Sequence, residues 1–310
     1  MEDIFMSRKK IAETVKTGKV LVSDGAWGTF LQKKGLKAGE CPELWCLEHA
    51  DDVKDIAQGY VDAGADMIES DSFGGTCYKL AHYGLADRVA EINEAAAKIS
   101  REAAGDEKWV IASIGPTGKM VIDDDEAEDY EGDELYATES DIYAAFKEQA
   151  IALEKGGADA ACVETMSDIR EALLAIKAVK ENTDLEVICT FTFEKTMQGS
   201  YKTMMGVSPE AAIKAAVAAG VDIAGANCGN GIERMIEIVT DMRKIDKEIP
   251  ILVHANAGLP HNVDGVDIFP ESPEDMAKIV PDLVAAGANI IGGCCGTTPA
   301  HIAAIKKAVG

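Results

Sequence analysis

The chain has 310 residues, and 47% of them are hydrophobic, which is enough to bury a large core. Its formal net charge of −24 excludes a typical nucleic-acid-binding protein, because such proteins carry a basic face. The N-terminal stretch is charged and amphipathic, and no segment contains an apolar run of about 18 residues. We therefore expect neither a signal peptide nor a membrane span, and we expect a cytoplasmic protein.

Short apolar segments alternate with amphipathic helical patterns, such as 169–180 and 209–220, along the whole chain. This alternation, with eight buried strands, predicts an α/β fold of the (β/α)8 TIM-barrel class. An open doubly wound sheet is the alternative, but its G-x-G-x-x-G fingerprint is missing after the first strand. The segments that we predict to be strands are 19–24, 65–70, 109–115, 159–164, 186–193, 222–228, 250–256 and 289–295.

Four of these strands follow the same short pattern: a helical stretch, then Gly, then Asp or Asn, then an apolar run. The copies read AGADMIES from Ala63, GGADAACVE from Gly156, AGVDIAGANC from Ala219 and AGANIIGGCC from Ala286. A glycine that ends a helix and leads into a buried strand is typical of a repeating βα architecture. No linker divides the chain, so we expect one barrel domain over residues 1–310.

Residues 123–141 are the most acidic part of the chain, with eleven Asp and Glu residues and no Lys or Arg. The segment is too polar to pack as a core element. It follows the third predicted strand, at the end of the barrel where the strands finish. We interpret it as an acidic loop insertion, which is either a solvated loop or a lid or docking surface.

The predicted strand ends gather the polar residues of the chain, and in such barrels the chemistry lies at these C-terminal ends. Three cysteines converge there, Cys228 from the sixth strand and Cys294 and Cys295 from the eighth. Three thiolates are a good ligand set for Zn²⁺ and leave its fourth tetrahedral position open for substrate. We therefore predict a catalytic zinc site. Carboxylates and amides at the other strand ends are Asp24, Glu69, Asp71, Glu164, Asn227 and Asn256.

Other interpretations of the cysteines remain open. Eight cysteines in a chain of this length do not indicate a disulfide framework, and Cys162 and Cys189 lie in apolar runs typical of core thiols. Cys294 and Cys295 are alternatively two structural thiols or a vicinal disulfide, and Cys228 an unpaired core thiol. A nucleophilic cysteine that works with His254 is a further alternative, although no group to orient His254 is evident.

The ligand set favours one kind of chemistry. A free thiol is mostly protonated at neutral pH, and coordination to Zn²⁺ removes that proton. Three cysteinate ligands give the site a net negative charge, which keeps a bound sulfur electron-rich. Hydrolysis would require neutral ligands that make the metal a stronger Lewis acid. The cysteines therefore indicate alkyl transfer to sulfur.

Distinctive motifs surround these residues: LVSDGAWGTFLQ, GADMIESDSFGG, IGPTGK, VETMSDIREA, GANCGNG, HANAGLPH and GGCCGTTPAHI. Together they resemble the homocysteine S-methyltransferase family over nearly the whole chain. This family includes the homocysteine-binding domain of cobalamin-dependent methionine synthase and betaine–homocysteine methyltransferase. The resemblance implies a (β/α)8 barrel that binds zinc through the same three cysteines.

The resemblance also implies roles for other residues. Asp24 and Glu164 are expected near the amino group of homocysteine, since an ammonium group prefers carboxylates; a helix N-cap or a structural acid is the alternative for each. Asn256 is expected close to the metal and able to ligate zinc when substrate is absent; a turn-forming Asn is the alternative. The remaining predicted substrate-binding residues are Gly25, Glu69 and Asn227.

Two segments depart from the family pattern. Methionine synthases usually read ETNTF where this chain has residues 69–73, ESDSF. Residues 191–206 are richer in methionine and aromatic residues than expected. Both segments border the predicted pocket, so the departures leave the zinc site in place and affect the identity of the substrate.

We predict a zinc-dependent methyltransferase that methylates homocysteine to methionine. Methylcobalamin on a partner, a betaine, S-methylmethionine or S-adenosylmethionine could serve as donor. The chain ends at residue 310 without a recognisable cobalamin domain, so we expect any corrinoid donor on a separate protein, which the acidic insertion could help to dock. The alternative is methyl transfer from a methoxy, methylthio or methylamine substrate to a corrinoid protein. A binding protein without turnover is a third hypothesis.

Overall fold

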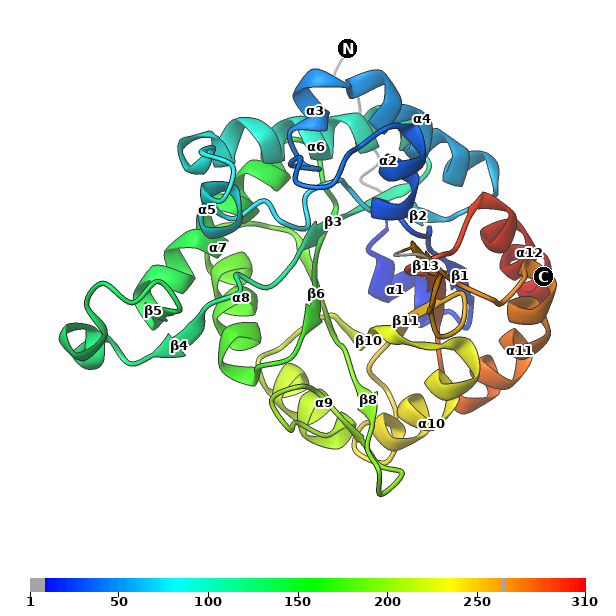
Figure 1. The fold of residues 1–310 in the computed structure, drawn as a ribbon. Helices are drawn as coiled ribbons and strands as arrows, with labels where there is room; N and C mark the ends of the chain where they lie inside the picture. Colours follow the sequence, from blue (N-terminus) through cyan, green and yellow to red (C-terminus); the bar gives the residue numbers. More distant parts are fainter. Residues whose placement is uncertain (1–8, 264–265) are drawn as a thin grey trace, which may run out of the picture.

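Eight parallel strands surround the centre of the protein in a computed structural model that describes residues 9–263 and 266–310 (Figure 1). Neighbours along the chain are neighbours in the sheet, and the two end strands meet where the amide of Asp66 donates to the carbonyl of Val22 at 2.7 Å. The predicted barrel class and its strands are confirmed, and the open doubly wound sheet is wrong. The strands are β1 (Leu21–Val22), β2 (Met67–Ile68), β3 (Trp109–Ile114), β6 (Ala160–Met166), β7 (Glu186–Phe191), β10 (Ile223–Gly231), β11 (Ile251–Asn256) and β14 (Ile290–Gly293).

One helix follows each strand and packs on the outside of the barrel, as the helical patterns 169–180 and 209–220 predict for two of them (Figure 1). The buried faces of these helices and the outward side chains of the strands form the larger apolar core. The helices are α4 (Ala50–Asp62), α6 (Val89–Ala104), α7 (Glu139–Lys155), α8 (Ile169–Asn182), α9 (Pro209–Ala218), α10 (Ile232–Arg243), α11 (Pro273–Ala286) and α12 (Pro299–Val309).

The repeated sequence pattern marks a repeated structural junction before β2, β6, β10 and β14. In each copy the glycine has a positive φ, between 77° and 113°, which ends the preceding helix. The Asp or Asn two positions later forms two hydrogen bonds with one residue of the preceding strand. Its amide donates to that residue's carbonyl, and its side chain accepts from that residue's amide. These residues are Asp66, Asp159, Asp222 and Asn289.

A short helix, α1 (Ile11–Val15), lies at the end of the barrel where the strands begin (Figure 1). Its buried side chains share an apolar cluster with strand residues that include Met67 and Cys162. The carboxylate of Glu186 accepts hydrogen bonds from the amides of Ile11 (2.6 Å) and Ala12 (3.0 Å), which satisfies donors at the start of the helix. This end of the barrel is therefore covered by the chain itself, and the strands open at their C-terminal ends.

Loops at the open end carry short two-stranded excursions after β3, β7 and β11. Four short helical segments also lie in the loops that follow β1 and β2: α2 (Gly28–Lys34), α3 (Trp45–Glu48), α5 (Cys77–Ala81) and η1 (Ala86–Arg88). The excursions pair β4 (Met120–Ile122) with β5 (Tyr136–Thr138), β8 (Glu194–Lys195) with β9 (Tyr201–Lys202), and β12 (His261–Val263) with β13 (Val266–Ile268).

The acidic segment forms a projecting arm between β4 and β5, with the 3₁₀ helix η2 (Asp124–Tyr130) at its tip. Residues 123–135 are exposed, as a solvated loop should be. Arg170 of α8 forms ion pairs with Asp123 and Glu139 at the base of the arm. The arm extends outward beyond α7 and α8, away from the barrel opening, so this placement does not support a lid (Figure 1).

Over the described ranges, 9–263 and 266–310, none of the helices combines the length and the apolar character needed to cross a lipid bilayer.

Candidate metal centre and active site

The three predicted cysteines meet at the open end of the barrel. Cys228 lies in β10, and Cys294 and Cys295 directly follow β14. Their Sγ atoms all lie within 4.8 Å of one another, and those of Cys294 and Cys295 are 4.0 Å apart. A tetrahedral zinc ion about 2.3 Å from each sulfur requires sulfur–sulfur distances of about 3.8 Å. The thiols are therefore spaced as a zinc site requires, with little rearrangement.

The backbone at these positions is unusual in ways that bring the thiols together. Cys228 has a φ of 57°, and the pairing of β10 with β11 shifts register between Asn227 and Gly231. Such a bulge bends the strand at the position that carries Cys228. A Cβ added at Gly293 would lie 2.3 Å from Oγ1 of Thr297, so only glycine lets β14 pass there and present its two cysteines.

The thiols share one negative charge when no metal compensates them. Hydrogen bonds from Cys294 and Cys295 lower the pKa of the Cys228 thiol to about 3. The same contacts raise the pKa of Cys295 to about 12 and the pKa of Cys294 well above its usual range. Three thiolates at this spacing therefore need a bound cation before all of them can ionise.

Asn256 supplies a second sign of a metal centre beside the cysteines. Its side chain hydrogen-bonds the Cys228 sulfur and helps to lower the pKa of that thiol. Its Oδ1 atom is buried and has no hydrogen-bond partner within the described part of the chain. Buried acceptors are normally satisfied, and an orphaned oxygen next to three thiols fits a metal ligand.

The structure supports neither a vicinal disulfide nor a cysteine–histidine nucleophile. All eight cysteines are free thiols, and Cys162 and Cys189 are fully buried in apolar clusters as their sequence context predicts. The imidazole of His254 does not hydrogen-bond the thiols, since its Nδ1 lies 3.4 Å from Oε1 of Glu69 and its Nε2 has no partner within residues 9–263 and 266–310. A cysteine–histidine nucleophile is therefore not assembled.

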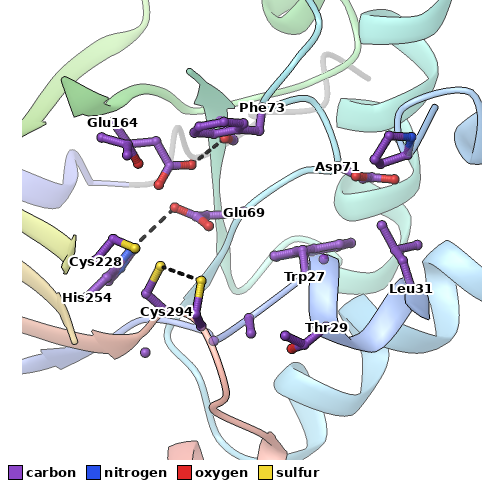
Figure 2. Close-up of a pocket in the computed structure, with 18 of the residues that line it drawn as sticks. Trp27, Thr29, Leu31, Glu69, Asp71, Phe73, Glu164, Cys228, His254 and Cys294 are labelled. Atoms are coloured by element: carbon purple, nitrogen blue, oxygen red, sulfur yellow. Dashed lines mark hydrogen bonds and ion pairs between the residues drawn. The ribbon is translucent and has the colours of Figure 1, made fainter. Parts of the chain in front are cut away.

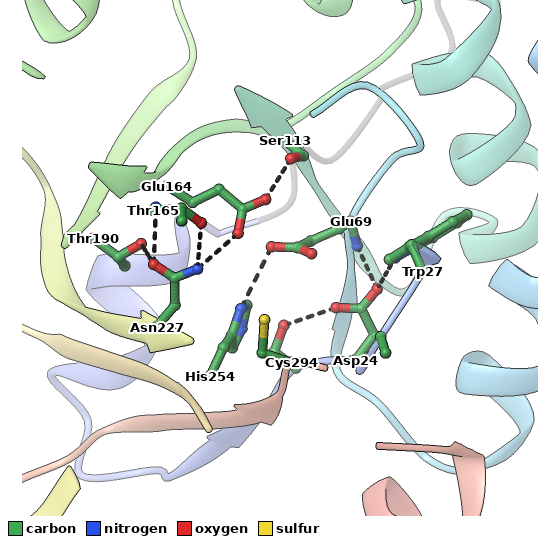
Figure 3. Close-up of polar contacts among 12 residues, drawn as sticks. Asp24, Trp27, Glu69, Ser113, Glu164, Thr165, Thr190, Asn227, His254 and Cys294 are labelled. Atoms are coloured by element: carbon green, nitrogen blue, oxygen red, sulfur yellow. Dashed lines mark hydrogen bonds and ion pairs between the residues drawn. The ribbon is translucent and has the colours of Figure 1, made fainter. Parts of the chain in front are cut away.

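Asp24, Glu69 and His254 form a second polar cluster around Cys294 (Figure 3). Their ligand atoms lie within 4.8 Å of one another, and all three side chains are buried. The indole of Trp27 and the amide of Glu69 donate to Asp24 at 2.9 and 2.8 Å. Burial and the neighbouring Glu69 raise the pKa of Asp24 to about 7, and burial raises the pKa of Glu69 to about 8. Burial also lowers the pKa of His254, so burial disfavours the charged form of every member of this cluster.

Glu164 approaches the same centre from β6 (Figure 3). The hydroxyl of Ser113 donates to one carboxylate oxygen, and Nδ2 of Asn227 donates to the other at 3.1 Å. Burial, followed by the charge of Glu69, raises the pKa of Glu164 well above its ordinary value. The carboxyl groups of Glu69 and Glu164 thus face one small volume, with Asp24 next to Glu69, and that volume strongly favours a positively charged group.

A cavity of about 290 Å³ joins the cysteines to these carboxyl groups. The Cys228 and Cys294 thiols point into it from one side, and Trp27 and Phe73 form part of the opposite walls (Figure 2). Its lining also includes the buried Asp71, whose carboxylate receives only the Cys46 thiol at 3.8 Å among the described contacts. Lys and Arg are absent from the described lining, so the cavity disfavours anions.

The structure places most of the predicted residues around this cavity. Gly25, Glu69, Glu164 and the three cysteines line it, and Asp24 lies directly behind Glu69. Asn256 and Asn227 are buried next to Cys228 and are not part of the described lining.

Sequence reasoning did not assign several residues that shape the site. Trp27, in DGAWGT, lines the cavity inside a motif that had already been singled out. His254, in HANAGLP, also lines the cavity but was considered only as the partner of a nucleophilic cysteine. Ser113 and Thr190 hold Glu164 and Asn227, but each lies within an apolar strand pattern that carries no signal for them.

Comparisons with known proteins agree with this geometry. A family model described as homocysteine S-methyltransferase matches residues 21–309. The methionine synthases of Mycobacterium tuberculosis and Mycobacterium leprae are each 31% identical to the chain, over 95% and 94% of its length. The alignments cover 25% and 24% of those proteins, so the chain spans about a quarter of their length.

A solved structure shows the same fold. The homocysteine methyltransferase MmuM from Escherichia coli, in a metallated form, has a TM-score of 0.75 to this chain at 23% identity. The match covers 95% of this chain and 98% of that one. An oxidized form of the same protein has a TM-score of 0.74.

Proposed function

Since the chain belongs to the homocysteine S-methyltransferase family, we propose that it transfers a methyl group to the sulfur of homocysteine and forms methionine. One observation carries this proposal: three cysteine thiols with metal-ligand spacing open onto a cavity lined by carboxyl groups. A sulfur ligand and an ammonium group on one small molecule would satisfy both halves of that cavity.

Cys228, Cys294 and Cys295 would hold a zinc ion in this account. When bound, zinc removes the proton from a coordinating substrate thiol and keeps the sulfur nucleophilic at neutral pH. The three thiolates keep the centre electron-rich, which suits attack by sulfur on a methyl group. Gly292 and Gly293 allow the close strand approach that presents two of these ligands.

The carboxyl groups of Asp24, Glu69 and Glu164 would receive the substrate ammonium. Two of them are held in place before substrate arrives: Trp27 donates to Asp24, and Ser113 donates to Glu164. Their raised pKa values mean that they ionise most readily when a cation is present. The apolar wall formed by Trp27 and Phe73 keeps the reacting sulfur away from bulk water.

The reaction balances without an oxidant or a reductant. A bond forms between the methyl carbon and the homocysteine sulfur while the bond between that carbon and the donor breaks. The bonding electrons stay with the donor, and the thiol proton leaves the protein. The chain therefore has to position two groups in line and does not have to supply a redox partner.

A separate corrinoid protein as the methyl donor is part of the proposal. A cavity of about 290 Å³ is too small to enclose a corrinoid, so such a donor would have to present its methyl group at the opening of the barrel. Phe73, which is 40% exposed, stands at that opening. The aligned methionine synthases extend far beyond the matched quarter of their length, which is compatible with a donor held outside this barrel.

Zinc content and turnover test the proposal together. Replacement of Cys228, Cys294 or Cys295 by Ala should remove stoichiometric zinc and abolish homocysteine-dependent methionine formation. Cys77→Ala is the matched control, because Cys77 is a half-buried thiol on α5 outside the cavity lining. Retention of zinc by all three variants would refute the ligand assignment. Methyl transfer from a methoxy, methylthio or methylamine compound to a corrinoid protein, with none to homocysteine, would favour the reverse reaction.

A further inference from the structure

We propose that Asn227 is a positioning residue that couples the metal centre to the carboxyl group that receives the substrate amino group. The inference rests on the proposed function and deepens it. Asn227 directly precedes Cys228, a proposed metal ligand, and its side chain contacts Glu164, a proposed partner of the ammonium (Figure 3).

The side chain of Asn227 is completely buried, and its hydrogen-bonding capacity is filled. Oδ1 accepts from the amide of Thr165 at 2.9 Å and from the hydroxyl of Thr190 at 2.8 Å. Nδ2 donates to Oε2 of Glu164 at 3.1 Å and to Oγ1 of Thr165 at 2.7 Å. No hydrogen-bonding position is left for a ligand, so the amide acts on its neighbours and not directly on substrate.

These contacts join two strained positions. Thr165 and Cys228, with φ values of 61° and 57°, are the only non-glycine residues with positive φ in the described ranges. A β-branched residue such as Thr165 rarely adopts this conformation, and such strain persists only where surrounding contacts impose it. Asn227 binds both the amide and the hydroxyl of Thr165 and is the residue before Cys228.

The same contacts join two irregular strand ends. The pairing of β6 with β7 shifts register between Val163 and Met166, and the pairing of β10 with β11 shifts between Asn227 and Gly231. Thr192 of the loop after β7 also donates to the Asn227 carbonyl at 2.9 Å. Glu164 and Cys228 therefore lie at bulges of the two strands that flank β7, and the Asn227 side chain contacts both β6 and β7. We infer that a shift of either bulge displaces the other.

The chemistry of the side chain explains why an amide is needed. Aspartate in this place would keep the two accepting contacts but would lose both donors and put a second carboxylate against Glu164. Serine is too short to reach both strands. Only an amide of this length accepts from β7 and donates to Glu164 at the same time.

The test measures metal binding and ligand discrimination in addition to turnover. We would compare wild type with Asn227→Asp, and with Asn227→Ser in case the first variant does not fold. Zinc affinity is measured by competition with a chromophoric chelator, and the metal environment by the absorption spectrum of the Co²⁺-substituted protein. The contribution of the substrate amino group to binding is measured as the ratio of the affinities for homocysteine and for 4-mercaptobutanoate, which lacks that group.

We expect Asn227→Asp to weaken zinc binding about 10- to 100-fold and to change the Co²⁺ spectrum. The ratio of affinities for homocysteine and 4-mercaptobutanoate should fall toward one. Glu164→Gln should also reduce that ratio, and the double variant should lose less than the sum of the two single losses. Asn289→Ala is the matched control. It removes an asparagine that ties two strands at the opposite end of the barrel, and it should leave the spectrum unchanged.

Two outcomes separate the possible failures. If wild type binds neither Zn²⁺ nor Co²⁺, the proposed function fails. If wild type binds metal and Asn227→Asp keeps its affinity and spectrum, or if its effect on ligand preference adds fully to that of Glu164→Gln, only the coupling role of Asn227 is overturned.

Discussion

Asp24 and Glu69 are neighbouring buried carboxyl groups, and their charged forms are unfavourable while no cation lies beside them. Burial, together with the neighbouring Glu69, raises the pKa of Asp24 to about 7, and burial raises the pKa of Glu69 to about 8, so the neutral forms are favoured. A substrate ammonium reverses the balance, because it pairs with the ionised forms. Binding of the amino group therefore has to release the protons that these groups hold at lower pH.

The preference of the zinc-loaded protein for homocysteine over 4-mercaptobutanoate should increase as the pH rises from 5.5 to 7.5. Both ligands lose the same thiol proton, so their affinity ratio isolates the amino group. The raised pKa values of Asp24 and Glu69 lie above the start of this range, so each proton released changes the ratio by about tenfold per pH unit at most. Isothermal titration calorimetry with both ligands at several pH values measures this affinity ratio.

Asp24→Asn is the control for this pH dependence. It removes one ionisable group and keeps an oxygen that can accept from Trp27 and from the Glu69 amide. The slope of the ratio with pH should become shallower in this variant. A ratio that does not change with pH in wild type would show that the amino group does not bind at these carboxyl groups.

For individual residues, the sequence predicts which side chains lie close together better than it predicts the role of each one. The C-terminal end of a strand is a defined place in a barrel, so Cys228, Cys294 and Cys295 could be brought together on pattern alone. The bulge after Asn227 could not be foreseen, because a register shift depends on contacts such as those to Thr165 and Thr190. Asn227 was expected to bind substrate, and the structure places it behind the cavity wall.

The four junctions of Gly with Asp or Asn, which precede β2, β6, β10 and β14, have the same structure around the barrel. A basic side chain from a neighbouring helix covers each junction. Arg101 pairs with Asp159, Lys180 donates to the Gly220 carbonyl, and Arg243 donates to the Gly287 carbonyl and to Asn289. Lys306 completes the set by pairing with Asp66 at 2.6 Å. Each junction thus ties two strands and one outer helix at the N-terminal end of the barrel.

Asp66→Ala should lower the free energy of unfolding by about 1–3 kcal/mol, because it removes the side-chain contacts to Lys306 and to the amide of Val22 where β1 and β2 meet. Burial raises the pKa of Asp66, but the hydrogen bonds from Lys306 and Val22 outweigh burial and lower it. The stabilisation is therefore complete above the ordinary pKa of aspartate and is lost as the pH falls below it. Urea denaturation at pH 7 and at pH 3 measures both effects.

Asp66→Asn separates the two contacts. It can still accept from the Val22 amide but cannot form the ion pair with Lys306. Its free energy of unfolding at pH 7 should therefore lie between those of wild type and Asp66→Ala. Equal stability of all three proteins at pH 7 would show that this junction does not hold the barrel closed.

The strands and helices of the barrel were predictable because each is repeated and buried. The excursions β4–β5, β8–β9 and β12–β13 were not predicted as strands, because each of their strands is only two or three residues long. Their pairing depends on loop length and turn geometry and not on an apolar pattern.

For the whole molecule, the open end of the barrel differs from the rest of the surface. Several large apolar side chains are exposed on its loops, and the acidic arm lies on the same side of the strands. The arm carries eight of the carboxyl groups that make the chain so acidic, between residues 124 and 134. The exposed apolar residues of these loops include Phe73, Met120, Met197, Met204, Leu259 and Ile268.

The acidic arm should affect transfer from a protein donor and leave the zinc site unchanged. Conversion of its eight carboxylates between residues 124 and 134 to the corresponding amides keeps its length and shape. Zinc content and homocysteine affinity should match wild type, because the arm projects outward from the barrel (Figure 1) and none of its residues is part of the described cavity lining. With a methylated corrinoid protein whose docking face is basic, kcat/KM should fall about tenfold or more at low salt, since charge steering increases association rates by that order.

Ionic strength supplies the control for this last experiment. Salt screens attraction between exposed charges, so the wild-type rate should fall as salt increases while the neutralised variant changes little, and the two should converge near 1 M salt (about 3 Å screening length). Glu248→Gln, at the opposite end of the barrel, should behave as wild type. If the neutralised variant keeps both the wild-type rate and its salt dependence, the arm does not steer the donor. The attraction would then have to come from other acidic side chains around the opening.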